Sequence, residues 1–245
     1  NRIIHYEGAT RGGTEHSDLW SVMYPNISKC DSEANYNWRQ QPYFMCEYAH
    51  AMGNAVGNLK EYWDIIESST YGIGGCIWDW VDQSIYDPQA IKNGQLEKNG
   101  FPYYTSGYDY PGPHQGNFCN NGIVTADRAW TAKLTEVKKV YQYVKFTFAN
   151  NTLVVRNKYN FINLNEFTLR YTLLCNGSVV EENTATLPSI APGSTGTVSL
   201  SFTTPMEQGN EYALNVELLK NKAEIWCEAG YPMASEQFVL QERTA

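Results

Sequence analysis

Residues 46–54 read CEYAHAMGN, and this stretch decides the fold of the first part of the chain. It follows an apolar run that begins at Pro42, so Glu47 stands where a strand would give way to a turn of small residues. Barrel enzymes present their catalytic groups in this way, at the carboxyl ends of parallel strands. A solvated glutamate at a strand end would occupy the same position. The pattern therefore makes Glu47 a candidate catalytic residue without fixing its chemistry.

The sequence around this stretch alternates short apolar runs with helical or loop segments over about the first 135 residues. We predict four strands that are apolar nearly throughout, as expected of strands buried on both faces: residues 2–7, 18–24, 42–48 and 74–81. A helix is predicted within residues 57–68, where apolar side chains recur at i, i+3, i+4 and i+7. This alternation indicates an α/β domain, and four such strands are half of a (β/α)8 TIM barrel.

After residue 144 the apolar pattern changes to period two, which is typical of strands with one buried face. The alternating rows are Phe167, Leu169, Tyr171, Leu173 and Tyr212, Leu214, Val216, Leu218. Asn176-Gly177 between two such runs predicts a tight hairpin turn. We expect an immunoglobulin-like antiparallel β-sandwich at residues 139–245, after a half-barrel domain at residues 1–138. No cluster of His, Glu or Asp suggests chemistry in the sandwich, so we interpret it as a structural spacer.

Composition excludes several classes of partner. The formal net charge is −8 and only 18% of residues are charged, which leaves no basic stripe for nucleic acid. No run of about 18 apolar residues exists, so no membrane partner is expected. The six cysteines lack metal-ligand spacing and predict free thiols that act as small hydrophobes. Free thiols favour a reducing compartment such as the cytoplasm, although a periplasmic protein can also keep them.

Three further segments accompany CEYAHAMGN along the chain. Residues 74–84 read GGCIWDWVDQS, residues 118–122 read FCNNG, and residues 126–128 read ADR. Trp78 follows Glu47 by 31 positions (78 − 47). Together these motifs resemble the large bacterial β-galactosidases of glycoside hydrolase family 2. The resemblance covers the C-terminal half of the catalytic barrel, and the sandwich that follows it resembles the family by architecture and a WxEAG-like segment at residues 226–230.

The resemblance implies roles for individual residues. It makes Glu47 the catalytic nucleophile and Tyr24 a catalytic phenol beside it. It places His50, Trp78 and Asn121 in the substrate pocket, with the sugar stacked on the indole. It also implies a sodium site that includes the Phe118 carbonyl and the Asn121 side chain, of which a third ligand is absent from this sequence. The magnesium ligands of such enzymes are implied to lie outside this chain.

Retaining glycoside hydrolysis requires a second carboxyl group about 5–5.5 Å from the nucleophile. From the residues alone, the strand-end candidates are Glu7, Asp79 and Asp82. Asp79 and Asp82, beside two tryptophans, are as able to anchor loops as to titrate, and Glu7 is the more tempting candidate. The resemblance argues against Glu7, because it implies an acid/base Glu in a strand that precedes Asn1. The chain, which begins abruptly in an apolar run, is therefore expected to be a fragment of a longer protein and to be inactive alone.

Other readings stay open beside this one. Family 2 β-glucuronidases or β-mannosidases share the barrel, and a non-catalytic carbohydrate-binding or scaffold module would use Glu47 and the aromatic residues only to hold sugar. The expected partners are a β-galactoside and the rest of the parent polypeptide. A half-barrel also has unpaired edge strands, which predict either pairing with another copy, giving a homo-oligomer, or a rearrangement of the N-terminal segment.

Overall fold

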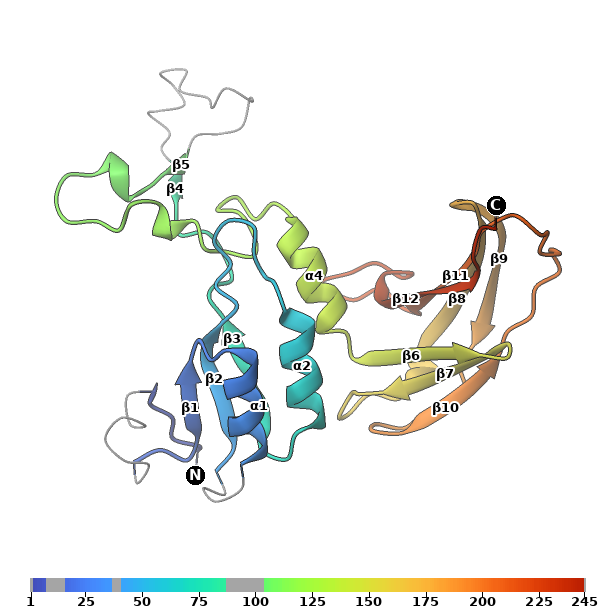
Figure 1. The fold of residues 1–245 in the computed structure, drawn as a ribbon, viewed down its shortest axis with the longest axis horizontal. Helices are drawn as coiled ribbons and strands as arrows, with labels where there is room; N and C mark the ends of the chain where they lie inside the picture. The colour runs from blue at the N-terminus through green and yellow to red at the C-terminus, as the bar shows by residue number, and fades with distance from the viewer. Residues whose placement is uncertain (1, 8–15, 37–40, 87–103, 245) are drawn as a thin grey trace. The chain divides into compact units, whose positions relative to one another are not determined.

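The structure is a computed structural model that describes residues 2–7, 16–36, 41–86 and 104–244. The chain divides into two compact units, Asn1–Val140 and Tyr141–Ala245 (Figure 1). Residues 87–103, for which the glycine- and proline-rich sequence predicts a long loop that continues to residue 117, lie outside the described residues. In the part of the chain that is described, no helix has the length and apolar character needed to cross a membrane.

The first unit contains a parallel sheet of three strands in the order β1-β2-β3. The strands are β1 (Trp20–Met23), β2 (Tyr43–Tyr48) and β3 (Gly72–Ile77). The helices are α1 (Ile27–Asn35) and α2 (Leu59–Ser68), which connect successive strands, and α4 (Ala132–Val140). Helix α2 packs between α1 and α4 (Figure 1). The strand–helix alternation predicted from the sequence is therefore present, as an open sheet that does not close into a barrel.

The strand predicted at residues 2–7 is wrong. Its residues form no ladder, and Ile4 is bonded to Asp18 rather than to a strand: Ile4 N donates to the Asp18 carboxylate at 2.7 Å, and Asp18 N donates to Ile4 O at 2.8 Å. Ile3 and Tyr6 are 72% and 69% exposed. An apolar run predicts that a segment can be buried, but a strand also requires a neighbour with which it can pair successively. This segment contacts the sheet through side chains instead, as where the His5 ring meets the Phe44 ring with centroids 5.4 Å apart.

Helix α2 forms where the predicted amphipathic pattern lies. Leu59 and Ile66 are buried, and the four predicted positions share one face. Strand β3 is rich in glycine, and it packs closely at two of these positions, of which Gly75 faces atoms that cannot easily move. A Cβ on Gly75 would lie 2.8 Å from the Cβ of Met45, and one on Gly72 would lie 2.8 Å from Ile66. The absence of side chains thus lets β3 lie tightly against β2 and α2.

Between β3 and α4, a short hairpin precedes two single-turn helices. The hairpin pairs β4 (Ile85–Tyr86) with β5 (Tyr104–Thr105). The turns are η2 (Gly107–Asp109) and η3 (Gly116–Cys119). The loop after η3 returns to the strand edge, because the backbone of Asp82 donates to Val124 O at 3.0 Å.

The second unit is built from antiparallel strands in two sheets, ordered β10-β7-β6 and β12-β11-β8-β9. Its strands are β6 (Val144–Ala149), β7 (Thr152–Asn157), β8 (Phe167–Cys175), β9 (Ser178–Thr186), β10 (Thr195–Ser199), β11 (Tyr212–Lys220) and β12 (Pro232–Gln241). Asn176 and Gly177 have φ values of 48° and 81° in the tight turn between β8 and β9, as predicted. The immunoglobulin type of this arrangement stays a prediction.

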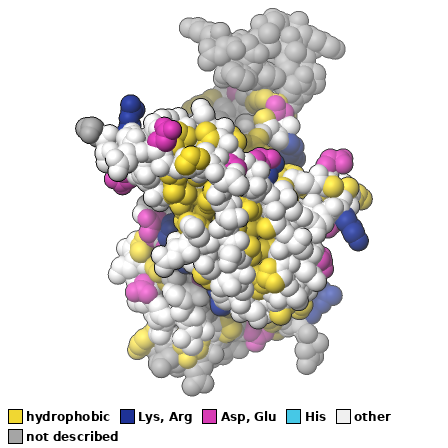
Figure 2. Space-filling model, turned by 90° about the vertical axis from the view of Figure 1, so that its right-hand side faces the viewer, with side chains coloured by type: hydrophobic (Ala, Val, Ile, Leu, Met, Phe, Trp, Pro, Cys, Tyr) yellow, Lys and Arg dark blue, Asp and Glu magenta, His cyan; other side chains and the backbone are white. Residues whose placement is uncertain are grey.

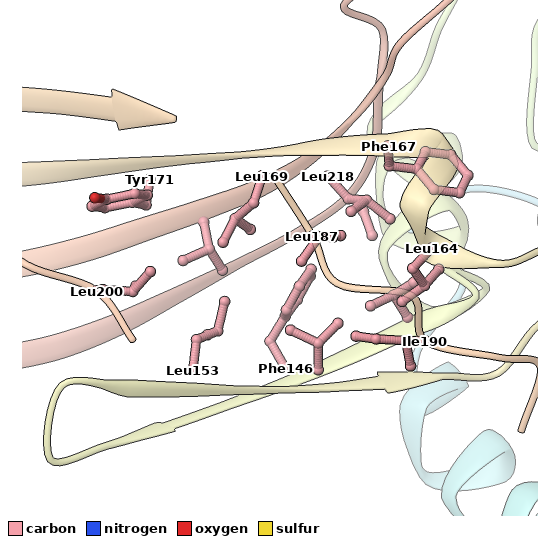
Figure 3. Close-up of a cluster of buried hydrophobic side chains, with 14 of the residues drawn as sticks. Phe146, Leu153, Leu164, Phe167, Leu169, Tyr171, Leu187, Ile190, Leu200 and Leu218 are labelled. Carbon is pink, nitrogen blue, oxygen red and sulfur yellow. The ribbon is translucent and has the colours of Figure 1, made fainter. Parts of the chain in front are cut away.

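One hydrophobic core lies between the two sheets (Figure 3). Phe146 and Leu153 reach into it from the three-stranded sheet, and Leu169 and Leu218 from the four-stranded sheet. All eight apolar residues of the two predicted alternating rows are buried. The period-two pattern therefore predicted correctly which face of β8 and β11 is turned inward.

The outer face of the four-stranded sheet has one apolar row and then polar rows. Val179, Leu174, Ala213 and Val239 occupy paired positions on the four strands. On the face of the molecule drawn in Figure 2, hydrophobic side chains gather in bands among polar ones. Such exposure is common, because more than half of a protein surface is apolar.

The polar contacts of this unit include a carboxylate held by backbone groups. Glu181 on β9 accepts hydrogen bonds from the backbone of Thr203 and Thr204 and from the Asn183 amide, at 2.7–3.0 Å. These bonds, that of Thr203 first, lower the pKa of Glu181 to about 2. The contact fastens the segment after β10 to β9.

All six cysteines are free thiols, as predicted. Cys30 and Cys227 are buried, whereas Cys76 is exposed. The expectation that the thiols act as small buried hydrophobes therefore holds for some positions and is wrong for Cys76.

Candidate active site

Three of the predicted site residues lie at one edge of the parallel sheet. Tyr24 follows the end of β1, Glu47 is the penultimate residue of β2, and Trp78 follows the end of β3. Since parallel strands all point the same way, these residues meet at the carboxyl edge, where α/β enzymes place their sites. The topology alone thus brings together residues that are up to 54 positions apart (78 − 24).

Strand β2 is irregular at Glu47. Toward β1, Val22 pairs with Met45 but Met23 pairs with Glu47, so one residue of β2 is skipped. Toward β3, the pairing of Met45 with Gly75 resumes only at Tyr48 with Ile77. The extra residue on β2 relative to both neighbours is a bulge, a feature that redirects a side chain beside many active sites.

The Tyr24 hydroxyl lies close enough to the Glu47 carboxylate to interact with it. The backbones are also joined, because Tyr24 N donates to Glu47 O at 2.8 Å. Burial, and then the Glu47 carboxylate, raise the pKa of Tyr24. The phenol therefore stays protonated at neutral pH and can act as a donor toward the carboxylate.

The backbone has an uncommon conformation at Tyr24 and at Ala49, two residues after Glu47. Tyr24 and Ala49 have φ values of 48° and 47°, in the left-handed region that is sparsely populated by side-chain-bearing residues. Such residues persist where surrounding contacts hold them. One of these contacts is the hydrogen bond from the Tyr62 hydroxyl on α2 to Pro25 O, at 2.6 Å.

His50 lies between two aromatic rings. Its ring centroid is 6.1 Å from that of Tyr24 and 5.8 Å from that of Phe118, with both pairs tilted. The adjacent turn is fixed from α4, because Lys133 Nζ donates to Ala51 O at 2.7 Å. The predicted pocket histidine is thus beside the Tyr24–Glu47 pair, and the aromatic row continues to η3.

Trp78 and Asn121 are linked to the site through the backbone. Ala51 N donates to Trp78 O at 2.8 Å, which ties the strand end to the turn after Glu47. Asp79 N donates to Asn121 O at 2.7 Å, which ties the following loop to the same strand end. The Trp78 side chain is 38% exposed, so part of the indole is open to a ligand.

The Asn121 side chain has an unusual environment. It is 3% exposed, and its Oδ1 atom is buried without a hydrogen-bond partner among the described residues. A buried acceptor without a partner costs about 1–3 kcal/mol. A carbonyl oxygen of this kind is a ligand that hard cations prefer, so Asn121 fits the predicted sodium site.

Two of the three alternative carboxyl groups are tied to loops. Asp79 accepts from Val81 N at 2.9 Å and from Gln83 Nε2 at 2.6 Å. Asp82 accepts from Gly122 N at 2.8 Å. Asp79 therefore holds the turn that follows β3, and Asp82 anchors the loop that carries Asn121. Glu7 lies close enough to Cys46 to influence the pKa of its thiol.

Sequence reasoning missed the residues that support the site from a distance. The helical pattern puts Tyr62 on the apolar face of α2 but does not mark its bond to Pro25 O, and Lys133 lies 82 positions from the carbonyl it contacts. No local pattern marks such a contact, because a lysine on a helix is ordinarily exposed to solvent.

Two protein-family models match this chain, one in each of its two parts. Residues 1–146 match the family described as glycosyl hydrolases family 2, TIM barrel domain, and residues 153–241 match β-galactosidase, domain 4. A β-galactosidase of Priestia megaterium is 39% identical over 253 residues, covering 100% of this chain and 23% of the relative. A β-galactosidase of Vibrio cholerae is 33% identical over 255 residues, covering 99% of this chain and 24% of the relative.

This chain thus spans about a quarter of the length of these curated relatives. Among solved structures, the exo-chitosanase CsxA of Amycolatopsis orientalis is similar over 49% of this chain and 14% of that chain. Its identity is 17% and the TM-score is 0.33, a likeness too slight to assign a fold. The family match over residues 1–146 covers more than half of the sequence, and the chain therefore belongs to glycosyl hydrolases family 2.

Proposed function

We propose that this chain carries the nucleophile side of a retaining β-galactosidase site whose acid/base belongs to a longer protein. The observation that carries the proposal is the Tyr24–Glu47 pair, at a bulge on the carboxyl edge of the sheet. The β-galactosidase name of the relatives supports the choice of β-D-galactosides as substrates.

In the proposed reaction, the Glu47 carboxylate attacks the anomeric carbon and forms a covalent glycosyl-enzyme, while the leaving oxygen takes a proton from the acid/base. Water then hydrolyses the intermediate and releases Glu47. The neutral Tyr24 phenol is proposed to hold the carboxylate in position by a hydrogen bond. It is therefore assigned a positioning role in the first step.

The galactosyl unit would stack on the exposed part of the Trp78 indole and contact His50. A sodium ion, held by Asn121 Oδ1 and the Phe118 carbonyl, would supply an electropositive contact for a sugar hydroxyl. The buried Asn121 oxygen without a partner supports this assignment. Magnesium, in the longer protein, is proposed to bind residues outside this chain.

The proposed acid/base is not one of the strand-end carboxylates described here. Asp79 and Asp82 are occupied as loop anchors. We therefore expect the chain alone to be inactive. Strands β1 and β3 are the two edges of the parallel sheet, and edges of this kind pair readily with further strands. The remaining barrel strands of the longer polypeptide are the proposed partners there, and self-association is expected of the chain alone.

A non-catalytic carbohydrate-binding module is the second candidate. Exposed aromatic rings at the strand edge favour sugar binding in either case. Binding alone does not require a carboxylate held by a protonated phenol, which supports the enzyme. The second unit is proposed to be an immunoglobulin-type spacer in both.

Covalent trapping separates the two functions. The longer protein is incubated with a 2-deoxy-2-fluoro-galactoside that has a good leaving group, and its peptides are analysed by mass spectrometry. The proposed function predicts one label, on Glu47, and none on the Glu47→Gln variant. Reversible binding without a label would support the module, and a label on another residue would refute the assignment of the nucleophile. Turnover of an aryl galactoside by this chain alone, dependent on Glu47, would refute the external acid/base.

A further inference from the structure

The second unit has an open pocket of about 560 Å³ at one end of the four-stranded sheet. Its lining comes from the turn before β8 and the loop after β11: Asn165, Glu166, Lys220, Asn221, Lys222 and Glu224. The volume is within the range of about 300–1,000 Å³ that is usual for small-molecule sites. The pocket is formed entirely by the second unit, whereas the Glu47 site is formed by the first.

The charges that line the pocket cancel. Lys220 forms an ion pair with Glu224, and the other two charged groups, Lys222 and Glu166, are of opposite sign. A site with no net charge has no electrostatic preference for a phosphate, a carboxylate or a free cation. The charge balance therefore favours a neutral ligand.

Several polar side chains of the pocket are available for hydrogen bonding. Asn221 is engaged, because its Oδ1 accepts from the Thr168 hydroxyl at 2.6 Å. The side chains of Asn165, Glu166 and Lys222 have no hydrogen-bond or ion-pair partner among the described residues. An amide, a carboxylate and an ammonium group together offer donors and acceptors, which is the combination that a ligand with several hydroxyl groups can satisfy.

A fixed indole adjoins the pocket. Trp226 is 56% exposed, and its Nε1 donates to Glu224 Oε2 at 2.9 Å. Its ring meets Tyr231 edge-on, with centroids 5.8 Å apart and an interplanar angle of 78°. Glu224 is itself held by Lys220, whose ammonium group lies 5.4 Å from the Phe167 ring centroid. The indole is thus held in place beside the pocket while much of its surface remains open.

We propose that this pocket binds a neutral pyranose sugar. The apolar face of the sugar would stack on Trp226, and its hydroxyl groups would bond to Asn165, Glu166 and Lys222. The site would hold carbohydrate without transforming it, since the proposed nucleophile is in the other unit. The inference does not depend on the reaction assigned to Glu47.

The experiment uses the full chain with 15N-labelled tryptophan, in which seven indole N–H signals are available for nuclear magnetic resonance. A Trp226→Phe variant assigns one signal, and methyl β-galactoside and methyl β-glucoside are the probes. The proposal predicts a saturable shift of the Trp226 signal with at least one probe. Asn165→Ala, which removes a side chain without an internal partner, should weaken this binding about tenfold, as expected for one hydrogen bond.

Trp130 is the matched control, because it is 57% exposed and lies in the first unit. Its signal should not move with the probes. An unmoved Trp226 signal, or an affinity that is the same in Asn165→Ala and Glu166→Ala as in the wild type, would overturn the proposal. A shift of the Trp78 signal reports the Glu47 site instead, so failure of the pocket and failure of the proposed function give different results.

Discussion

Replacing Gly122 by alanine is the sharpest test of how the loop that carries Asn121 is held. A Cβ at this position would lie 2.1 Å from Asp82 N, 2.3 Å from Val81 C and 2.5 Å from Val124 O. Ordinary contact begins at 3.4 Å, so the nearest atom must move by about 1.3 Å (3.4 − 2.1). All three neighbours are backbone atoms, which cannot turn aside as a flexible side chain can.

The cost has two parts. Overpacking of a fitted site costs about 1–3 kcal/mol. Moving the loop also breaks the bond from Gly122 N to the Asp82 carboxylate, at 2.8 Å, which is worth about 1.5–3 kcal/mol because one partner is charged. We therefore expect the free energy of unfolding of the first unit to fall by about 2.5–6 kcal/mol. At a slope of about 2 kcal/mol per molar urea, the midpoint falls by about 1–3 M.

Urea unfolding followed by tryptophan fluorescence measures this change, because six of the seven tryptophans belong to the first unit and only Trp226 to the second. Gly57→Ala is the matched control, since a Cβ at Gly57 would meet nothing within 4 Å. The control should leave the midpoint unchanged or raise it slightly, through a lower entropy of the unfolded chain. Equal midpoints for the two variants would refute the close contact between the loop and the strand end.

Three other substitutions test further contacts described above. Leu214→Ala in the sandwich core should cost about 2–5 kcal/mol and lower the calorimetric melting temperature by about 10–20 °C. The control is Val239→Ala, which should change the melting temperature little because Val239 is 64% exposed. Equal effects of the two substitutions would contradict the assigned core. Glu181→Gln should lower the melting temperature at neutral pH, because the Thr203 N–H and its neighbours depress the Glu181 pKa from 4.5 to about 2. This difference is complete above pH 4.5 and should vanish as pH falls through about 2, and a difference that grows on acidification would exclude the contact. Tyr24→Phe in the longer protein should slow covalent labelling about 10- to 100-fold, since it removes a hydrogen bond to a carboxylate, and an unchanged rate would remove Tyr24 from the site.

Regular periodicity predicted the parts of the fold that bury one face. The rows that include Leu169 and Leu214 alternate strictly, and both lie in the core. The run at residues 2–7 is as apolar as a true strand, yet periodicity cannot tell whether a neighbour exists for it. The two-residue strands β4 and β5 were not predicted, because two residues are too few to display any period.

The candidate site was predictable where a motif placed a residue at a strand end. Glu47 and Tyr24 were expected to be adjacent, and they are joined by a backbone hydrogen bond and an interaction of their side chains. The sequence left the roles of Asp79 and Asp82 open, because the same residue type, aspartate, can either anchor a loop or exchange protons. Only the hydrogen bonds to backbone N–H groups separate these cases.

The glycines of β3 bear on the order in which the first unit comes apart. Gly72 and Gly75 let the strand approach its neighbours closely, but they contribute no side chain to the core. The strand is thus held mainly by its ladder to β2 and by α2, and glycine gains the most backbone freedom on release. Backbone amides of β3 should exchange with solvent sooner than those of β2, through local openings that leave the rest of the unit folded. The strand that leads to Trp78 would then be the most mobile wall of the candidate site.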